Sequence, residues 1–292
     1  MKSPLQSRPE GGCLYLVATP IGHLEDITLR ALRVLKEVDF IACEDTRQTR
    51  KLLTHYGIRK RLVSYHEHNE ITRSAELVVE LEQGAQVALV SDAGMPLISD
   101  PGHHLLALCR RHHIPVVPVP GASAVVAALA ASGMPTESFL FRGFLPPKAG
   151  ERRRELVLLA ALGRQVGTLA IYEAPHRLLD LLADMAAILG KRQAVVAREV
   201  TKLHEEFLRG SLEELHAHFD AHAPRGEITV LVAPPETNGK EVAAAPDVPL
   251  RARIEQLVAE QGLDSRAALK QAARERGISK REAYKQMLMD RG

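Results

Sequence analysis

The sequence has no tryptophan, and aromatic residues make up only 4% of the 292 residues. The chain therefore has few of the aromatic side chains that are needed to bind RNA by stacking many bases on aromatic rings. No apolar stretch approaches the roughly 20 residues of a membrane-spanning helix, and the first residues lack the apolar core of a secretion signal. Cys13, Cys43 and Cys109 are scattered without a CxxC pair, which argues against a disulfide framework or a zinc finger. These absences predict a cytoplasmic protein with no membrane partner.

Common nucleotide and metal motifs are missing as well. No GxGxxG follows the first expected strand, and neither GxxxxGK[ST] nor HExxH occurs, which disfavours a dehydrogenase, a P-loop NTPase and a zinc protease. His66 and His68 are two residues apart without a third ligand, so no metal is expected. The hydrophobic share of 46% and charged share of 25% are ordinary for a globular protein. The net charge of +2 does not by itself indicate nucleic acid.

Short β-branched runs alternate with helical patterns through the first half of the chain. This alternation predicts a mostly parallel sheet with helices on both faces. The turn-rich segment 133–138 separates an N-terminal α/β domain, 12–133, from a second α/β domain, 134–234, in which a partly antiparallel sheet is expected. In the first domain, five strands are expected, at 13–19, 39–43, 61–65, 86–91 and 114–120.

The C-terminal part of the chain differs in composition from the rest. Residues 235–249 are rich in proline and predict a linker. Residues 250–292 carry ten Lys/Arg and six Asp/Glu, so they hold all of the positive excess. Their helical patterns, joined by Gly-bearing turns, are typical of a helix-turn-helix that contacts nucleic acid, although a helical cap packed on a neighbouring subunit would give the same pattern. The expected RNA contacts in this extension are Lys280, Arg281 and Lys285.

Unusual polar loops follow the expected strands of the first domain, at the edge where open α/β sheets bind ligands. After the first strand, Pro20 fixes a tight turn. Three charged residues, Glu44, Asp45 and Arg47, follow the second strand at this edge of the sheet. A helix N-terminus explains the two acids but not the arginine, so a site that faces the substrate is an equal alternative.

The loop 91–102, SDAGMPLISDPG, is the most elaborate of these connections. Its two glycines, two prolines and two aspartates exceed what a plain connector needs. We expect backbone amides exposed at Gly94 and the side chain of Asp92 to hold a small polar ligand. The next turn offers the hydroxyl of Ser123. Because no strong pair of nucleophile and base is visible, these loops favour binding and positioning over covalent catalysis.

The second domain carries its own charged strand ends. Tyr172 and Glu173 follow one expected strand, and Arg198 and Lys202 follow another. The loop 145–154 is basic, and a solvated helix start and a contact with phosphates explain it equally well. Its candidate RNA contacts are Lys148, Arg152 and Arg153.

Six ordered strings carry a family resemblance. They are LYLVATPIGHLEDITLRALRVLKEVDFIACEDTRQTRKLL, SDAGMPLISDPG, PVPGASAVVAALAASG, GFLPPK, YEAPHRL and AREVTKLHEEFLRG. Together they resemble the tetrapyrrole methylase superfamily and, within it, the bacterial 16S rRNA (cytidine-2′-O)-methyltransferases, over about residues 12–233. Met95 departs from the family, which commonly has Thr there, so a side-chain contact from this position is doubtful.

The resemblance implies two α/β domains, a homodimer, and S-adenosylmethionine bound in the cleft between the domains. It implies methyl transfer to the ribose 2′-oxygen of a decoding-centre cytidine in 16S rRNA of the small ribosomal subunit. A tetrapyrrole methylase and a non-catalytic RNA-binding module remain the alternatives. The implied cofactor-binding residues are Pro20, Asp92, Ala93, Gly94, Ile98, Ser123, Ala124 and Tyr172.

Transfer to a ribose hydroxyl needs alignment of the 2′-oxygen with the methyl group and removal of one proton. A carboxylate can take the proton, and a nearby cation can bind a phosphate or the developing alkoxide. The sequence does not choose among the candidates. The candidate bases are Glu44, Asp45, Glu173 and Glu199, and the candidate cations are Arg47, Arg198 and Lys202.

Overall fold

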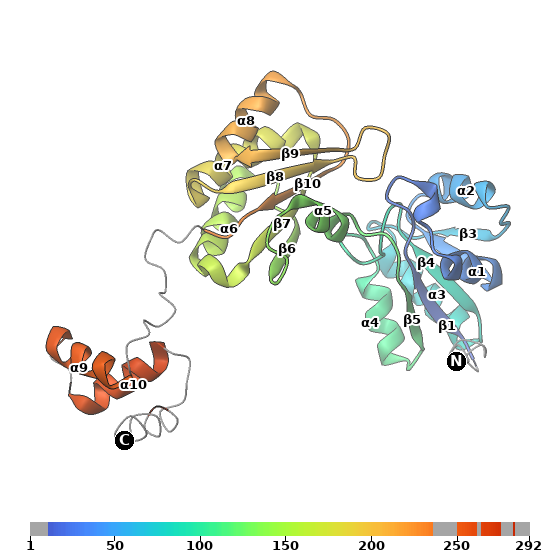
Figure 1. Ribbon diagram of the computed structural model, residues 1–292. Coiled ribbons are helices and arrows are strands. Elements are labelled where there is room, and N and C mark those ends of the chain that lie inside the picture. Colours follow the sequence, from blue (N-terminus) through green and yellow to red (C-terminus); the bar gives the residue numbers. More distant parts are fainter. Residues whose placement is uncertain (1–10, 236–249, 262–263, 276–282, 284–292) are drawn as a thin grey trace. The chain divides into compact units, whose positions relative to one another are not determined.

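The computed structural model describes residues 11–235, 250–261, 264–275 and 283. The chain divides into two compact units, Met1–Pro235 and Glu236–Gly292. The first unit contains two five-stranded sheets, each covered by helices on both faces (Figure 1). The described helices include none that is long and apolar enough to cross a membrane.

The first sheet is entirely parallel, as the alternating pattern predicts. Its strand order is β3-β2-β4-β1-β5. Helices α1 and α2 pack on one face and α3 and α4 on the other, so β2 and β4 are buried along their whole length. The strands are β1 Cys13–Val17, β2 Phe40–Cys43, β3 Arg61–Ser64, β4 Gln86–Val90 and β5 Val116–Val119, and the helices are α1 Leu29–Glu37, α2 Thr46–His55, α3 Glu70–Glu82 and α4 His103–Arg111.

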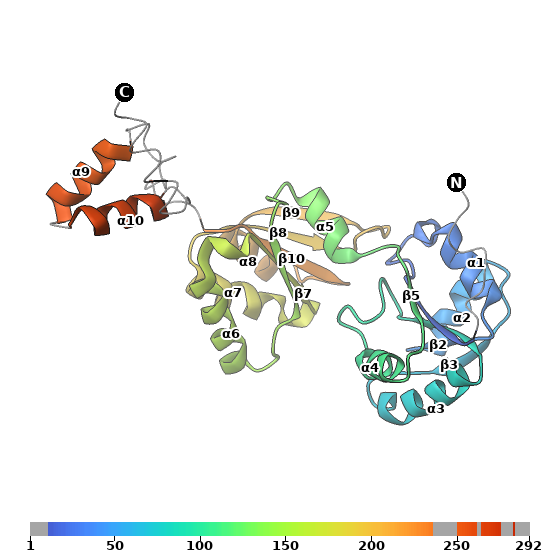
Figure 2. The same ribbon diagram turned by 90° about the horizontal axis from the view of Figure 1, so that it is seen from below.

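The second sheet is mixed, with strand order β6-β7-β10-β8-β9. Only β6 and β7 pair in parallel, and the other three pairs are antiparallel, which confirms the partly antiparallel prediction. Helices α6, α7 and α8 cover one face and α5 the other (Figure 2). The strands are β6 Phe139–Phe144, β7 Thr168–Glu173, β8 Gln193–Arg198, β9 Glu206–Ser211 and β10 Ile228–Val232, and the helices are α5 Ala124–Ser132, α6 Ala149–Leu162, α7 Leu178–Leu189 and α8 Leu212–Ala221.

Local sequence explains where several helices begin. The Thr28 side chain accepts a hydrogen bond from the backbone of α1, and Ser211 forms a reciprocal capping box with Glu214 at the start of α8. The basic segment 145–154 is mostly helical rather than a loop, because α6 already begins at Ala149.

The described part of the C-terminal unit is a pair of short helices, α9 Leu250–Gln261 and α10 Ser265–Glu275. Leu257 and Leu269 belong to a small apolar core that the two helices share. Asp264 caps α10 by accepting a hydrogen bond of 2.7 Å from the amide of Ala267. The expected RNA contacts Lys280, Arg281 and Lys285 lie outside the described residues, so their role stays a prediction.

Candidate functional site

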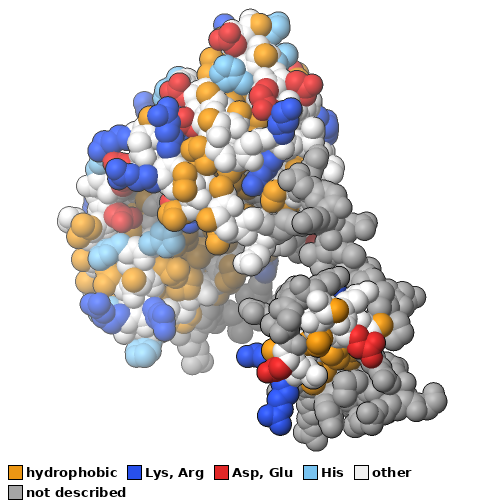
Figure 3. All heavy atoms as spheres, turned by 90° about the vertical axis from the view of Figure 1, so that its left-hand side faces the viewer, with side chains coloured by type: hydrophobic (Ala, Val, Ile, Leu, Met, Phe, Trp, Pro, Cys, Tyr) orange, Lys and Arg blue, Asp and Glu red, His pale blue; other side chains and the backbone are white. Residues whose placement is uncertain are grey.

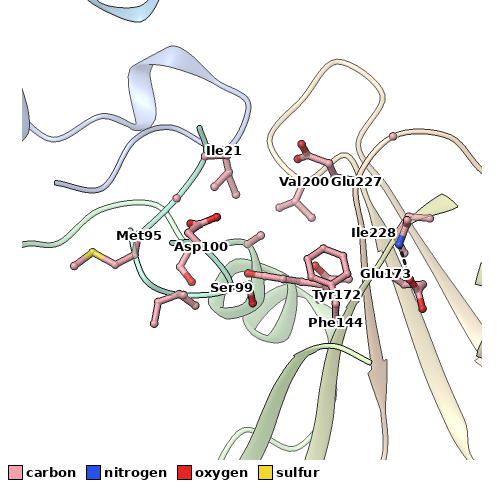
Figure 4. Close-up of a pocket in the computed structure, with 18 of the residues that line it drawn as sticks. Ile21, Met95, Ser99, Asp100, Phe144, Tyr172, Glu173, Val200, Glu227 and Ile228 are labelled. Atoms are coloured by element: carbon pink, nitrogen blue, oxygen red, sulfur yellow. Dashed lines mark hydrogen bonds between the residues drawn. The ribbon is translucent and has the colours of Figure 1, made fainter. Parts of the chain in front are cut away.

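A cavity of about 330 Å³ lies within the first unit, between the loop ends of its two sheets (Figure 4). Strands β6, β7 and β8 end at the same edge at which the antiparallel β10 begins. One wall comes from the first-sheet loops and carries Ile21, Met95, Ser99 and Asp100, and the opposite wall carries Phe144, Tyr172, Val200, Glu227 and Ile228.

Six of the eight predicted cofactor-binding residues line this cavity. They come from three separate segments: the loop after β4, the start of α5 and the end of β7. Chain segments that are far apart in sequence therefore converge on one hollow. The six are Ala93, Gly94, Ile98, Ser123, Ala124 and Tyr172.

The loops after β1 and β4 are pinned to each other beside the cavity. Thr19 and Gly94 exchange backbone hydrogen bonds of 2.9 and 3.1 Å, and the Thr19 hydroxyl donates to the carbonyl of Ser91 over 3.1 Å. The amide of Gly94 itself therefore donates to Thr19 and not to a ligand, and binding by other backbone amides of this loop stays a prediction. Gly94 has φ of +81°, a conformation that glycine adopts without strain.

The second part of the 91–102 loop has a strained backbone. Leu97 and Ser99 have φ of +72° and +67°, in the left-handed region that side chains disfavour. Ser99 also lies against Gly143, where an added Cβ would come within 2.8 Å of the Ser99 hydroxyl. A tertiary contact across the two sheets thus holds the loop in this conformation and fixes the direction of the next residue, Asp100.

Tyr172 takes over a capping role at the start of α5. Ser123 is the N-cap residue of α5 but makes no capping hydrogen bond. Instead, the Tyr172 hydroxyl accepts a hydrogen bond of 3.1 Å from the amide of Val125. The Tyr172 ring packs edge-on against Phe141, with 4.8 Å between ring centroids. This arrangement fixes the aromatic wall of the cavity and leaves the Ser123 hydroxyl without a capping bond.

Asp92 and Pro20 are absent from the lining of the cavity. Asp92 accepts a hydrogen bond of 3.1 Å from the amide of Asp45, so it ties the loop after β4 to the loop after β2. Burial raises the pKa of the Asp92 carboxyl. Asp92 thus connects these two loops, and a direct contact with a ligand in this cavity stays a prediction.

The charged loop after β2 also lies outside the cavity lining. Asp45 holds Arg47 in a bidentate pair, at 3.1 Å to Nε and 2.7 Å to Nη2, and these hydrogen bonds lower the pKa of Asp45 to about 2. Burial, with the nearby Asp92, raises the pKa of Glu44. The Arg47 side chain is 84% exposed, so its guanidinium is accessible to a large substrate.

Glu173 lines the cavity, but its carboxylate is paired with Arg177. Successive residues of a strand face opposite sides of the sheet, and Tyr172 packs on the α5 side. The Glu173 side chain is 0% exposed and lies 3.2 Å from Arg177. Its Oε1 also accepts a hydrogen bond of 2.8 Å from the amide of Ala174, whereas its buried Oε2 has no hydrogen-bond partner among the described residues, so the candidate role of Glu173 as the base stays a prediction.

The two candidate cations of the second sheet are already paired. Arg198 binds Glu206 at 2.9 Å. Lys202 binds Glu199 at 2.8 Å and Glu227 at 3.0 Å, and these partners raise its pKa. Both cations lie outside the cavity lining, and Lys202 acts as a bridge between two loops at its rim.

Of the three predicted RNA contacts in the segment 145–154, one is misplaced. Arg152 is 3% exposed and binds Asp184 at 2.7 Å, so its role is to pack α6 on α7 and not to reach a phosphate. Arg153 shares the same carboxylate at 2.7 Å but is 62% exposed, and Lys148 is 80% exposed. On the face shown in Figure 3, basic side chains are interspersed with acidic ones.

The sequence prediction missed Asp100, which lines the cavity. Burial raises the pKa of its carboxyl to about 6, with the carboxylates of Glu44 and Asp92 adding to the effect, while a hydrogen bond from Ser91 opposes it. The second Asp of the 91–102 loop was an available signal, but its burial depends on packing between the two sheets. The described residues contain no group of three or more potential metal ligands.

Comparison with known proteins places this geometry in a family. The family model for Tetrapyrrole (Corrin/Porphyrin) Methylases matches residues 13–216. The chain belongs to this family. A ribosomal RNA small subunit methyltransferase I of Halalkalibacterium halodurans is 53% identical over 238 residues, covering 81% of this chain and 80% of the relative. The enzyme of that name from Thermotoga maritima is 49% identical, covering 76% of this chain and 98% of the relative, so the chain also belongs with the ribosomal RNA small subunit methyltransferases I.

Solved structures of tetrapyrrole methylases share the fold at low identity. Uroporphyrin-III C-methyltransferase of Thermus thermophilus complexed with S-adenosyl homocysteine superposes with a TM-score of 0.54 and 22% identity, covering 75% of this chain and 97% of that one. The methyltransferase CobJ superposes with a TM-score of 0.59 and 19% identity, covering 77% and 95%. These likenesses establish two α/β sheets of the tetrapyrrole methylase type.

Proposed function

We propose that the protein is an S-adenosylmethionine-dependent methyltransferase that modifies a cytidine ribose 2′-oxygen in 16S rRNA of the small ribosomal subunit. The identities near 50% with ribosomal RNA small subunit methyltransferases I support the rRNA substrate. The choice of a decoding-centre cytidine rests on the resemblance carried by the six strings of the sequence. The cavity between the sheets is the observation that links this reaction to the structure of the chain.

The chemistry of the cavity lining fits the cofactor. Its acidic residues are Asp100, Glu173 and Glu227, and the lining contains no Lys or Arg. S-adenosylmethionine has a sulfonium and an ammonium group against one carboxylate, so a lining without Lys or Arg does not repel its net positive charge. The apolar walls, which include Met95 and Phe144, suit the adenine ring and methylene groups.

Within this proposal, the chain's residues bind and orient the reactants. When bound, S-adenosylmethionine supplies a methyl group already activated on sulfur. Ser123 and the backbone at Ala93 and Ala124 supply polar contacts, and Tyr172 supplies an aromatic wall. The apolar lining excludes water, so the ribose oxygen is the nucleophile that reaches the methyl group.

Cations outside the cavity are proposed to bind the RNA backbone. Arg47 and Lys148 are strongly exposed, and Arg153 is exposed on the same helix start as Lys148. Arg47 is fixed by Asp45 and so offers its remaining donors in a set direction. The basic C-terminal extension, 250–292, would add further phosphate contacts.

Assembly and location form the rest of the proposal. We infer a cytoplasmic homodimer with two α/β domains, 12–133 and 134–234, a linker at 235–249, and the extension. The family resemblance supports the dimer. The three free, buried cysteines are compatible with a reducing compartment. Light scattering of the purified protein tests the dimer: a mass near twice the 32.0 kDa of one chain supports it, and a single-chain mass contradicts it.

Methyl transfer from radiolabelled S-adenosylmethionine tests the function. We expect label in 16S rRNA when the protein is incubated with small ribosomal subunits that lack the modification. Nucleoside mass spectrometry should then find 2′-O-methylcytidine. Label in a tetrapyrrole but not in rRNA would instead assign the small-molecule reaction, and cofactor binding without transfer to either would contradict both.

A further inference from the structure

Three acidic residues line the cavity, and two of them have a cationic partner. The Glu173 side chain is 0% exposed and lies 3.2 Å from Arg177. The Glu227 side chain is 70% exposed and binds Lys202 at 3.0 Å. The described residues include no cation within 4.0 Å of Asp100 in an ion pair. Among the carboxylates of the lining, Asp100 is therefore the one without a cationic partner in the described part of the chain.

Asp100 is also held in position by its loop. It follows Ser99, whose left-handed backbone is braced against Gly143. In Figure 4, Asp100 lies between Ile21 and Ser99, on the wall opposite Val200 and Glu227. A base for proton transfer needs this kind of fixed placement inside the site rather than on a mobile surface chain.

We propose that the Asp100 carboxylate is the general base that takes the proton of the ribose 2′-hydroxyl during methyl transfer. This role rests on the proposed function. The new bond forms between the 2′-oxygen and the methyl carbon as the bond between that carbon and sulfur breaks. Sulfur leaves as the neutral thioether of S-adenosylhomocysteine, and the hydroxyl proton ends on the Asp100 carboxylate, so charge and atoms balance.

The surroundings of Asp100 suit a base that works near neutral pH. Burial raises the pKa of its carboxyl to about 6, and the charged groups acting on it are the carboxylates of Glu44 and Asp92. Across the cavity, burial raises the pKa of the Tyr172 phenol, and the negative charge of Asp100 raises it further. The phenol therefore stays protonated at neutral pH. Asp100 thus remains ionised at pH 7 and binds a proton more tightly than an ordinary aspartate does.

Single-turnover methyl transfer tests this role, with enzyme in excess over small ribosomal subunits and with saturating S-adenosylmethionine between pH 5.5 and 8.5. For the wild type, we expect the rate to rise with pH and to level off above about pH 6. Asp100→Asn should lower the rate by about 10²–10⁴-fold and abolish that rise, and Asp100→Glu should restore part of the rate. Glu82→Gln removes a distant exposed carboxylate that contacts His112 and serves as the control.

Cofactor affinity separates a base from a binding residue. Calorimetry should give Asp100→Asn a dissociation constant for S-adenosylmethionine within about threefold of the wild type. A weakened affinity with a wild-type rate at saturation would overturn the proposal and assign Asp100 to cofactor binding. An Asp100→Asn rate within threefold of wild type would also overturn it. If the wild type transfers no methyl group to rRNA, both the proposed function and this role fail.

Discussion

Replacing Asp100 by asparagine should remove a pH dependence from the free energy of unfolding. The folded-state pKa of about 6 lies above the ordinary aspartate value of 3.8. A group with a raised pKa contributes stability that is fully present below pH 3.8 and is lost as the pH rises through about 6. Above that pH, the ionised carboxylate destabilises the fold by up to about 3 kcal/mol, since each pKa unit corresponds to about 1.4 kcal/mol.

Asparagine has nearly the same shape but does not ionise, so the variant avoids this cost. We expect Asp100→Asn to unfold at a temperature several degrees above the wild type at pH 7.5, and to lose most of that advantage at pH 4.5. Thermal denaturation followed by circular dichroism at the two pH values measures the effect. The argument that Asp100 is ionised in a buried position would be refuted by either of two results. One is an equal gain in unfolding temperature at both pH values, and the other is a variant that is less stable than the wild type at pH 7.5.

Three further predictions concern packing, loop geometry and RNA binding. Asp184→Ala leaves Arg152 buried without its 2.7 Å partner and should cost about 3–5 kcal/mol in urea unfolding; a loss under about 1 kcal/mol would contradict that account. Gly143→Ala places a Cβ within 2.8 Å of the Ser99 hydroxyl and should slow methyl transfer. Gly133→Ala, which is also at positive φ but in open space, should leave the rate unchanged. Equal rates for the two variants would show that the contact between Ser99 and Gly143 does not shape the site. Deleting residues 246–292 should weaken binding to small subunits and spare S-adenosylmethionine affinity, and unchanged RNA binding would refute the role of the extension.

The architecture of the first sheet was predictable because its pattern is strong. Strands such as β2 are apolar along their length, and this pattern is typical of parallel strands covered on both faces. Parallel strands bring their following loops to one edge, and the structure does gather Gly94 and Ser123 there. Polar residues in those loops were therefore sound candidates even without a common nucleotide motif.

The charged candidates were harder to place because their roles depend on tertiary contacts. Glu173 adjoins Tyr172 in sequence and lines the same cavity, but its carboxylate pairs with Arg177, a contact that its position in the sequence does not reveal. Arg152 lies in a basic segment, but α6 starts early enough to bury its side chain. The elevated pKa of Asp100 depends on its burial in the folded chain and on the distant Glu44 as well as the neighbouring Asp92, so no sequence pattern ranks it above Asp92.

A crystal structure of the protein with S-adenosylhomocysteine tests the central claim most directly. The account predicts that the thioether sulfur lies in the cavity between the two sheets, with the ligand against Ala93, Ser123 and Tyr172, and with the Asp100 carboxylate facing the side from which a ribose hydroxyl approaches. A ligand bound elsewhere on the chain, or Asp100 turned away from the sulfur, would contradict it.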